Sequence, residues 1–578
     1  MKRLINTRSP LLWSVLVIGF IELIFTMPAA AQLDRVRSFI FDNAQLTGQA
    51  SLYGELYNVD GINRRRPPST GRFLFTPTLS LSRYASVSAD VMLSTEGSYA
   101  RQDMNIMGLH PTWRWGKAHL GDYTDSFSLY TYNGIRVKGA EIDLFPKKLR
   151  FTVGGGQTKR AVDGNVVVQS YAQHMMAGRL GYGKEQGSYF DLIFVKVEDD
   201  PGSLTKRDSI EYDYVIVDTL ETELDTLWVE PPYNPYAVTP QENVLAGIAT
   251  RLSLFENKVN LLVEASGSGY TKNLNNAPVS PDSIDMPNFF RGVVDRVYTP
   301  RRSSNVDFAV NSRLQFSVHK WRSELIYRYI GPGYISLATP STINDRQELG
   351  MSTSGRIGNH RIRLNWSRYA DNLLDQKDET NVRNQIRTSW AMNTKKWRSS
   401  VNMSYLLMGN DAMVDSLEWD FDNIVFSTHQ AYLFDQTSAF RQVGLQYTYQ
   451  TSDKNMPQNR IQSHYHTFNL TGQLRLQQTL NLNLSTGLSF RDTGTQGSYT
   501  TQVYSLRLTH SAFKNRLSTS LFSASSMIRD TRTFRTGLTS SYRLTRQNSL
   551  VLNLSYNDFR GTRRFHELRS SLTLSHRL

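Results

Sequence analysis

The sequence contains no cysteine in 578 residues. This absence excludes disulfide bonds, a metal site built from thiolates, and a lipid anchor attached through an N-terminal cysteine. An exported chain of this length could have used disulfides, so their absence indicates that another constraint holds this fold together.

Long apolar runs are also scarce. Beyond the N-terminal segment, no stretch approaches the roughly 18 uninterrupted apolar residues of a membrane-spanning helix. The N-terminal segment has three basic residues among its first eight, an apolar stretch at 11–27, and Pro-Ala-Ala-Ala at 28–31. This pattern predicts a secretory signal peptide over residues 1–31, and hence export. An uncleaved signal anchor is the alternative interpretation of the same residues.

Most of the remaining chain alternates between apolar and polar residues. The segment NVDFAVNSRLQFSVHKWRSELIYRYI (residues 305–330) does so for about two strand lengths, with a break at His319-Lys320. A period of two predicts β-strand, and the short break predicts a hairpin. The alternation leaves two folds open: a soluble sandwich whose apolar face covers a core, or a membrane barrel whose apolar face contacts lipid. A mean hydropathy of −0.42 fits both.

The lengths of the connections favour the barrel. Connections of two to five residues alternate with longer ones along most of the chain. The short set is 255–258, 319–320, 357–360, 393–396, 477–479, 512–515 and 545–548, and the long set is 199–243, 268–303, 331–345, 370–381, 408–422, 451–461 and 491–499. Tight periplasmic turns alternating with extended external loops are typical of outer-membrane barrels.

Aromatic residues lie where membrane interfaces would be. Trp321, Trp390 and Trp397 are near tight turns, and Tyr329, Tyr405 and Tyr556 are near the opposite strand ends. Amphipathic rings of this kind prefer the two interfaces of a bilayer.

We therefore predict an all-β fold, a transmembrane antiparallel up-and-down β-barrel of about 24–26 strands with long external loops. The predicted organisation is a signal peptide at 1–31, a short N-terminal periplasmic segment at 32–45, and the barrel at 46–578. Within the barrel, 199–243 is a long acidic external loop and 268–303 a second long external loop. The segment before the first strand is too short for a plug domain of the TonB-dependent kind.

These features together resemble the Gram-negative outer-membrane β-barrel class. HLGDYTDSFSLYTYNGIRVKGAEIDL (119–144), YIGPGYISLATPSTINDRQ (329–347) and YADNLLD (369–375) are similar to segments of large Bacteroidota-type barrels. The resemblance implies integral location in the cell outer membrane, with lipid and the barrel-insertion machinery as partners. The chain departs from the class at Leu578, where the insertion signal usually ends in an aromatic residue.

Arginine is prominent on the polar face of the predicted strands, in a chain with a formal net charge of +14. We predict a lumen lined by Arg313, Arg322, Arg328, Arg361, Arg363, Arg383, Arg387, Arg398, Arg475, Arg535 and Arg543. Interior arginines focus a positive potential and favour anionic solutes. The alternative is that they pair with carboxylates such as Glu324 or only bind water. The charge is not clustered with stacking aromatics, so we expect no nucleic-acid partner.

The segment 199–243 carries the opposite charge, with many carboxylates and few cations. As an external loop it could fold over the pore, bind divalent cations or contact a partner, and a solvated loop is the alternative. No EF-hand pattern is present. The acidic run of Asp371, Asp375, Asp378 and Glu379 offers no better cation site.

Few residues suggest catalysis. His464 and His466 flank Tyr465 and could act as bases or metal ligands, but no carboxylate or nucleophile accompanies them, and histidines at a barrel rim are the alternative. Gly154-Gly155-Gly156 does not match the phosphate-loop pattern, and it predicts a bend or close packing inside the barrel. We expect no enzyme activity, no cofactor and no metal.

The predicted function is a porin-like channel or a transport or secretion conduit with an arginine-rich lumen. A barrel of this width cannot be filled by one layer of side chains, so it must hold water, loops, or a periplasmic or plug partner. The alternative is a surface-exposed interaction or anchoring protein whose loops bind polysaccharide or a secreted partner.

Overall fold

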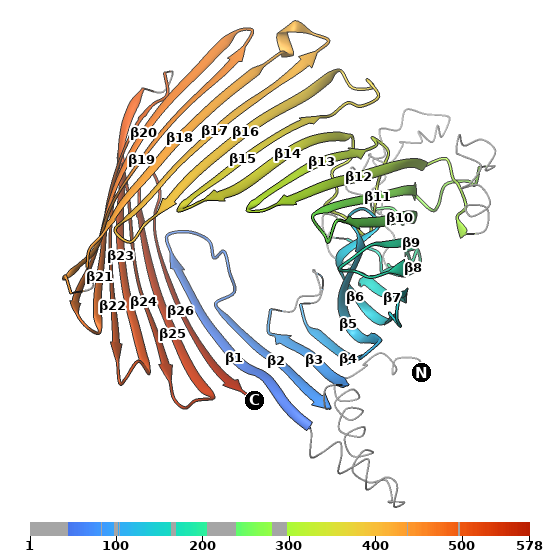
Figure 1. Ribbon diagram of the computed structural model, residues 1–578, viewed down its shortest axis with the longest axis horizontal. Helices are drawn as coiled ribbons and strands as arrows, with labels where there is room; N and C mark the ends of the chain where they lie inside the picture. The colour runs from blue at the N-terminus through green and yellow to red at the C-terminus, as the bar shows by residue number, and fades with distance from the viewer. Residues whose placement is uncertain are drawn as a thin grey trace, which may run out of the picture.

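The computed structural model describes residues 44–81, 84–96, 102, 104–162, 169–204, 238–279, 297–435, 437–494 and 497–578. These residues form one antiparallel sheet of 26 strands that closes on itself (Figure 1). The barrel closes between β1 (Ala44–Asp60) and β26 (Arg564–Arg577), which pair from Gln49 with Arg577 to Asp60 with His566. The predicted fold class and strand number are confirmed.

The strands follow one another around the barrel in chain order. Between β1 and β26 they are β2 (Ser69–Leu81), β3 (Ala85–Ser94), β4 (Ile106–Trp113), β5 (Gly116–Ser128), β6 (Tyr132–Leu144), β7 (Leu149–Lys159), β8 (Gln173–Gly183), β9 (Tyr189–Asp199), β10 (Glu242–Leu254), β11 (Val259–Thr271), β12 (Ser304–Val318), β13 (Trp321–Ile330), β14 (Arg346–Ile357), β15 (His360–Ala370), β16 (Glu379–Asn393), β17 (Trp397–Ala412), β18 (Asp420–Leu433), β19 (Phe440–Met456), β20 (Asn459–Gln477), β21 (Leu480–Asp492), β22 (Ser498–Ala512), β23 (Leu517–Ile528), β24 (Thr531–Arg543) and β25 (Asn548–Arg560). No helix in the described part of the chain is long and apolar enough to cross a bilayer.

Each strand presents an apolar face outward and its other face to the barrel interior. Residues that pair across strands point to the same side of a sheet, so the register assigns them to a face. In the hairpin of β12 and β13, Leu314 pairs with Leu325 on the outward face, and Gln315 pairs with Glu324 on the inward face. Large exposed hydrophobic side chains such as Leu192 continue the outward face around the barrel. This apolar band fits a bilayer, and the chain is an integral outer-membrane β-barrel.

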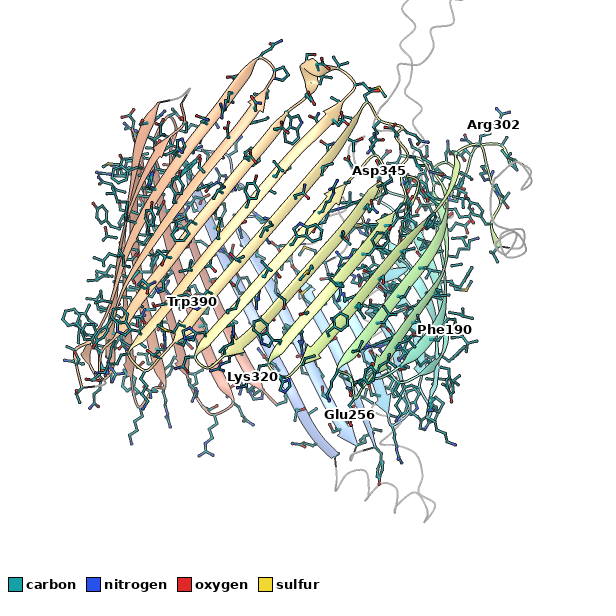
Figure 2. The ribbon with its side chains drawn as sticks, turned by 45° about the horizontal axis from the view of Figure 1, so that its top comes forward. Phe190, Glu256, Arg302, Lys320, Asp345 and Trp390 are labelled. Atoms are coloured by element: carbon teal, nitrogen blue, oxygen red, sulfur yellow. The ribbon has the colours of Figure 1, made fainter. Side chains whose placement is uncertain are left out.

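The aromatic residues predicted for the interfaces all lie on the outward face. Trp321 pairs with Val318, and its ring covers Gly355, where a Cβ would lie 2.2 Å from the ring. Trp397 packs edge-on against Tyr432, with ring centroids 5.2 Å apart. The register places Trp390, Tyr329, Tyr405 and Tyr556 on the same face. Lys320 and Glu256 lie at the tight-turn end of the barrel, and Asp345 lies at the opposite end (Figure 2).

The connections follow the predicted asymmetry only in part. The turns at 319–320 and the loop at 331–345 have the predicted bounds. The predicted long connection 451–461 is wrong, because β19 runs to Met456 and β20 begins at Asn459, leaving two residues between them. These strands extend beyond the apolar band, where both faces are polar and the alternation stops although the strand continues.

Several predicted segments fall on residues that the structure does not describe. The signal peptide at 1–31 and all but two residues of the segment at 32–45 lie outside the described residues. Most of the acidic loop 199–243 and part of the loop 268–303 do so as well, and only their bases are described, next to β9 and β10 and to β11 and β12.

The inward face of β5–β13 differs from the predicted polar lumen. Side chains of β9 that point inward include Ile193, Val195 and Val197, which are at most 4% exposed. They belong to one buried apolar cluster, which comprises Tyr123, Phe127, Tyr130, Tyr132, Val137, Met175, Ala177, Ile193, Val195, Val197, Leu245, Ala249, Ala309, Ile330, Tyr334 and Ala338. Tyr130, Tyr334 and Ala338 come from connections rather than strands, so these connections fold into the barrel and cover its wall.

Candidate functional site: the inner wall of the barrel

The loop between β13 and β14, residues 331–345, folds inward, and we call it the inward loop. Its Tyr334 is 1% exposed, and its hydroxyl hydrogen-bonds Ser266 of β11 and donates to the backbone oxygen of Tyr130, 2.8 Å away. The backbone N–H of Gly333 donates to Asp307 of β12 at 2.8 Å. These contacts hold the inward loop against three different parts of the wall.

Asn243 of β10 provides a second anchor for the inward loop. Its side-chain amide donates to the backbone oxygen of Ile335 at 3.1 Å, and its side-chain oxygen accepts from the backbone N–H of Leu337 at 3.0 Å. A buried amide that pairs both its donor and its acceptor with one loop fixes the position of that loop. This anchor could not be predicted from the sequence, because one asparagine in a strand has no distinctive pattern.

The C-terminal end of the inward loop is tied to the next external loop by charge. The Asp345 carboxylate forms an ion pair with Lys377 and accepts a hydrogen bond from the backbone N–H of Leu373 at 2.8 Å. Burial of this carboxyl opposes ionisation, but the hydrogen bonds from Lys377 and the backbone outweigh it and lower the pKa of Asp345. Asp345 is therefore ionised at neutral pH, and its ion pair with Lys377 is formed at that pH.

Two segments singled out separately in the sequence meet at this place. Tyr130 belongs to the segment 119–144 and lies in the connection between β5 and β6. Its ring packs against that of Tyr334, from the segment 329–347, with centroids 6.1 Å apart. The backbone N–H of Asn133 also donates to the oxygen of Ala338 at 3.4 Å. Together the two segments cover one side of the barrel interior.

The predicted arginines share one face of the sheet. Each pairs across strands with residues on the side of Asn311 and Glu324, the inward side. Two of them have carboxylate partners: Arg313 with Glu324 at 3.0 Å, and Arg328 with Glu348 at 2.7 Å. The others form no ion pair with any described residue, and all of these except Arg383 are exposed: Arg322, Arg361, Arg363, Arg387, Arg398, Arg475, Arg535 and Arg543.

A network of charged residues crosses the inner wall from β5 to β9. Arg150 of β7 reaches over β8 to Asp191 of β9, with nitrogen–oxygen distances of 2.8 and 3.1 Å. Nearby, Asp143 accepts hydrogen bonds from Thr152 at 2.7 Å and from Arg179 at 3.2 Å. These pairs are buried on the inward face, so the wall beneath the apolar cluster is held by neutralised charges.

His464 and His466 do not face the interior. They pair across strands with Thr451 and Tyr449 on the outward side, whereas Tyr465 between them points inward. The Nδ1 atom of His466 is 3.0 Å from the Tyr447 hydroxyl, and its ring lies beside that of Tyr449. Among the described residues, no carboxylate cluster that could hold a metal includes either histidine.

The glycine run 154–156 lies in β7 and packs closely against β6. A Cβ on Gly154 would lie 2.6 Å from the Cβ of Glu141, and one on Gly156 would lie 2.4 Å from the backbone oxygen of Lys138. The run therefore allows close packing with a side chain inside the barrel, which agrees with the prediction from the sequence. The acidic residues of 371–379 form ordinary loop contacts, such as Asp371 with the backbone N–H of Asn381 at 2.6 Å.

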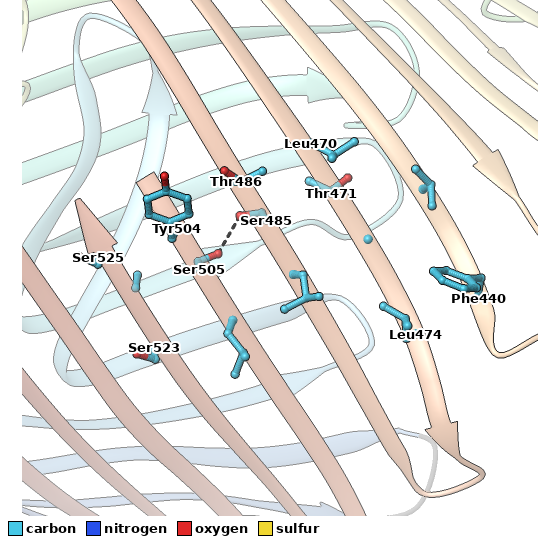
Figure 3. A pocket seen from close by; sticks show the side chains of 15 residues that line it. Phe440, Leu470, Thr471, Leu474, Ser485, Thr486, Tyr504, Ser505, Ser523 and Ser525 are labelled. Carbon is cyan, nitrogen blue, oxygen red and sulfur yellow. Dashed lines mark hydrogen bonds between the residues drawn. The ribbon is translucent and has the colours of Figure 1, made fainter. Parts of the chain in front are cut away.

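A shallow apolar groove lies on the wall of β19–β23 (Figure 3). Leu470 and Leu474 of β20 and Tyr504 of β22 border it on the outward face, with small residues such as Gly472 between them. Ser485 and Ser505, which point inward behind it, are hydrogen-bonded at 2.7 Å. Because the groove opens outward within the apolar band, lipid chains rather than dissolved solutes contact it.

Comparison with known proteins finds likeness in fold alone. No family model and no curated protein matches the sequence. The siderophore receptor PirA from Pseudomonas aeruginosa is 11% identical, with a TM-score of 0.39, over 92% of this chain and 80% of that chain. OccK1 (OpdK) from Pseudomonas aeruginosa is 10% identical, with a TM-score of 0.27, over 59% of this chain and 92% of that chain. Wzi from Escherichia coli, described as a carbohydrate-binding β-barrel involved in group 1 capsule assembly, is 10% identical, with a TM-score of 0.30, over 67% of this chain and 86% of that chain.

The molecule's own geometry is that of an outer-membrane barrel, which serves as a channel or presents a surface to the outside.

Proposed function

We propose that the barrel is a porin-like channel for small hydrophilic solutes, with a preference for anions. The observation that carries this proposal is the set of exposed arginines on the inward face that have no carboxylate partner among the described residues. Positive side chains with low-dielectric walls raise the local concentration of anions.

The distribution of these arginines supports the same proposal. The inward loop and the buried apolar cluster cover the wall of β5–β13. Arg361 and Arg363 of β15, Arg387 of β16 and Arg398 of β17 lie on the next strands along, where the inward face is more exposed. The paired arginines, Arg313 and Arg328, lie instead at the edge of the covered region. These four unpaired arginines therefore lie on strands outside the part of the wall that the inward loop and the apolar cluster cover.

We test the proposal by replacing three neighbouring arginines, Arg361, Arg363 and Arg387, with glutamine. The variant is expected to lose anion preference, measured as a shift of the reversal potential across a planar bilayer under a KCl gradient. The shift should grow as salt is lowered, because screening extends over about 8 Å at 0.15 M and further in dilute salt. Arg368→Gln is the matched control, since Arg368 lies in β15 on the outward face, and it should leave the reversal potential unchanged.

Two results would contradict the proposal. A wild-type barrel that favours cations would show that the arginines do not set the selectivity. A folded wild-type barrel that passes no current at all would favour the alternative role, in which the barrel anchors surface loops that bind polysaccharide or a secreted partner.

A further inference from the structure

Three side chains from one hairpin converge on the inner wall beneath the apolar cluster. His119 and Asp125 belong to β5, and Glu141 belongs to β6, directly opposite His119 in the register. Each offers one ligand atom, an imidazole nitrogen or a carboxylate oxygen, and these atoms lie within 4.8 Å of one another. A cation could therefore contact all three after small side-chain rotations.

Glu141 gives an independent sign that this place is built for a cation. It is 3% exposed, and neither of its carboxylate oxygens accepts a hydrogen bond from any described residue. The Asp125 carboxyl group lies within hydrogen-bonding reach of Glu141. Two adjacent buried carboxylates are strongly unfavourable while both are ionised, so this place needs a bound cation or a shared proton. Gly154 makes room for the Glu141 side chain, because a Cβ there would lie 2.6 Å from the Glu141 Cβ.

The hydrogen bonds of His119 leave one of its nitrogens free. Its Nδ1 atom lies 2.8 Å from Nδ1 of His110, and Nε2 of His110 lies 3.3 Å from the Asp90 carboxylate. When Nε2–H of His110 donates to Asp90, Nδ1 of His110 carries a lone pair and accepts a hydrogen bond from Nδ1–H of His119. The free lone pair of His119 is then on its Nε2 atom. That Nε2 atom is buried and has no hydrogen-bond partner in the described part of the chain. A carboxylate behind a histidine is the arrangement that orients imidazole ligands toward metals.

The neighbouring charges leave Glu141 as the unbalanced group. Lys117 lies 3.4 Å from an oxygen of Asp125 and 3.7 Å from one of Asp143, and Arg179 also contacts Asp143. These two cations balance the two aspartates. The carboxylate of Glu141 has no such partner among the described residues.

We propose that His119, Asp125 and Glu141 bind a divalent transition-metal ion of the Zn²⁺ type on the inner wall. One imidazole nitrogen and two carboxylate oxygens are a ligand set that Zn²⁺ accepts, whereas Ca²⁺ and Mg²⁺ prefer oxygen ligands alone. A bound ion would join β5 to β6 through ligands from both strands of this hairpin. The bound ion would also neutralise Glu141.

Zinc content tests the proposal. Untagged full-length barrel in detergent micelles is stripped of metal with EDTA, dialysed with Zn²⁺ and then dialysed against metal-free buffer. Mass spectrometry measures the zinc bound per chain, and titration calorimetry of the stripped barrel measures the affinity for Zn²⁺. The wild type is expected to retain one Zn²⁺ per chain. Glu141→Gln should abolish this binding, and Asp90→Asn should weaken it by about 10–100-fold, since Asp90 acts only through His110. The double variant of His464 and His466 to alanine removes outward histidines and should bind as the wild type does.

Either of two results overturns the proposal. The first is a wild-type barrel that retains no zinc, in which case Asp125 and Glu141 share a proton instead. The second is a Glu141→Gln barrel that retains as much zinc as the wild type. If Glu141→Gln fails to insert as a folded barrel, His119→Gln replaces it under the same criteria, because His119 is only partly buried.

Discussion

A Tyr334→Ala variant is expected to release the inward loop and to lose about 3–5 kcal/mol of the free energy of unfolding, the range for deleting a large buried ring. The ring is 1% exposed and packs on Tyr130, and its hydroxyl bonds Ser266 and the Tyr130 backbone oxygen. Chemical denaturation of the barrel in lipid vesicles measures the loss. Hydrogen exchange should show reduced protection of the backbone N–H groups of 331–345.

Two variants serve as controls for this result. Tyr334→Phe keeps the ring and removes only the hydroxyl, so a loss of about 1–3 kcal/mol is expected from the polar groups left unpaired. Ile343→Ala changes an exposed side chain, 64% accessible, in the same loop and should fall within about 0.5 kcal/mol of the wild type. If Tyr334→Ala behaved like Ile343→Ala, the loop would not be docked as described.

The fold was predictable because each strand can be recognised from its own local sequence pattern. Alternation in segments such as 305–330 identifies the strands and their faces, and turns such as His319-Lys320 identify the hairpins. Prediction failed at 451–461, where the strands leave the bilayer. There both faces of each strand contact water and are polar, so the apolar–polar alternation that distinguishes a strand from a loop is absent.

The interior was much less predictable. Inward residues of β9 such as Val195 and Val197 are as apolar as the outward Leu192, because the inward loop shields them from water. That shielding depends on contacts such as the one between Tyr130 and Tyr334, more than 200 positions apart. His119 and Glu141 likewise meet only through the register of one hairpin. Neither contact has a local pattern, so periodicity could not reveal it.

An Asp191→Ala variant is expected to lose about 3–5 kcal/mol of the free energy of unfolding, because it leaves a buried arginine without a partner. Asp191 is 1% exposed and Arg150 is 9% exposed.

Gly181 of β8 lies between Arg150 and Asp191, and a Cβ there would lie 1.9 Å from an oxygen of Asp191. Gly181→Ala should therefore displace the same carboxylate and weaken the barrel in the same assay. A matched substitution of the exposed pair, Asp453→Ala opposite Arg460, should cost only about 0–1 kcal/mol.

The double variant Arg150→Met with Asp191→Leu separates the ion pair from the volume it fills. Because two buried charges cost solvation that their attraction only partly returns, replacing both with apolar groups is expected to restore most of the stability lost in Asp191→Ala. Recovery in the double variant, measured by the same denaturation, would show that the single variant fails through the unpaired Arg150. A double variant as unstable as Asp191→Ala would instead mean that β7, β8 and β9 depend on the charges themselves to keep their register across Gly181.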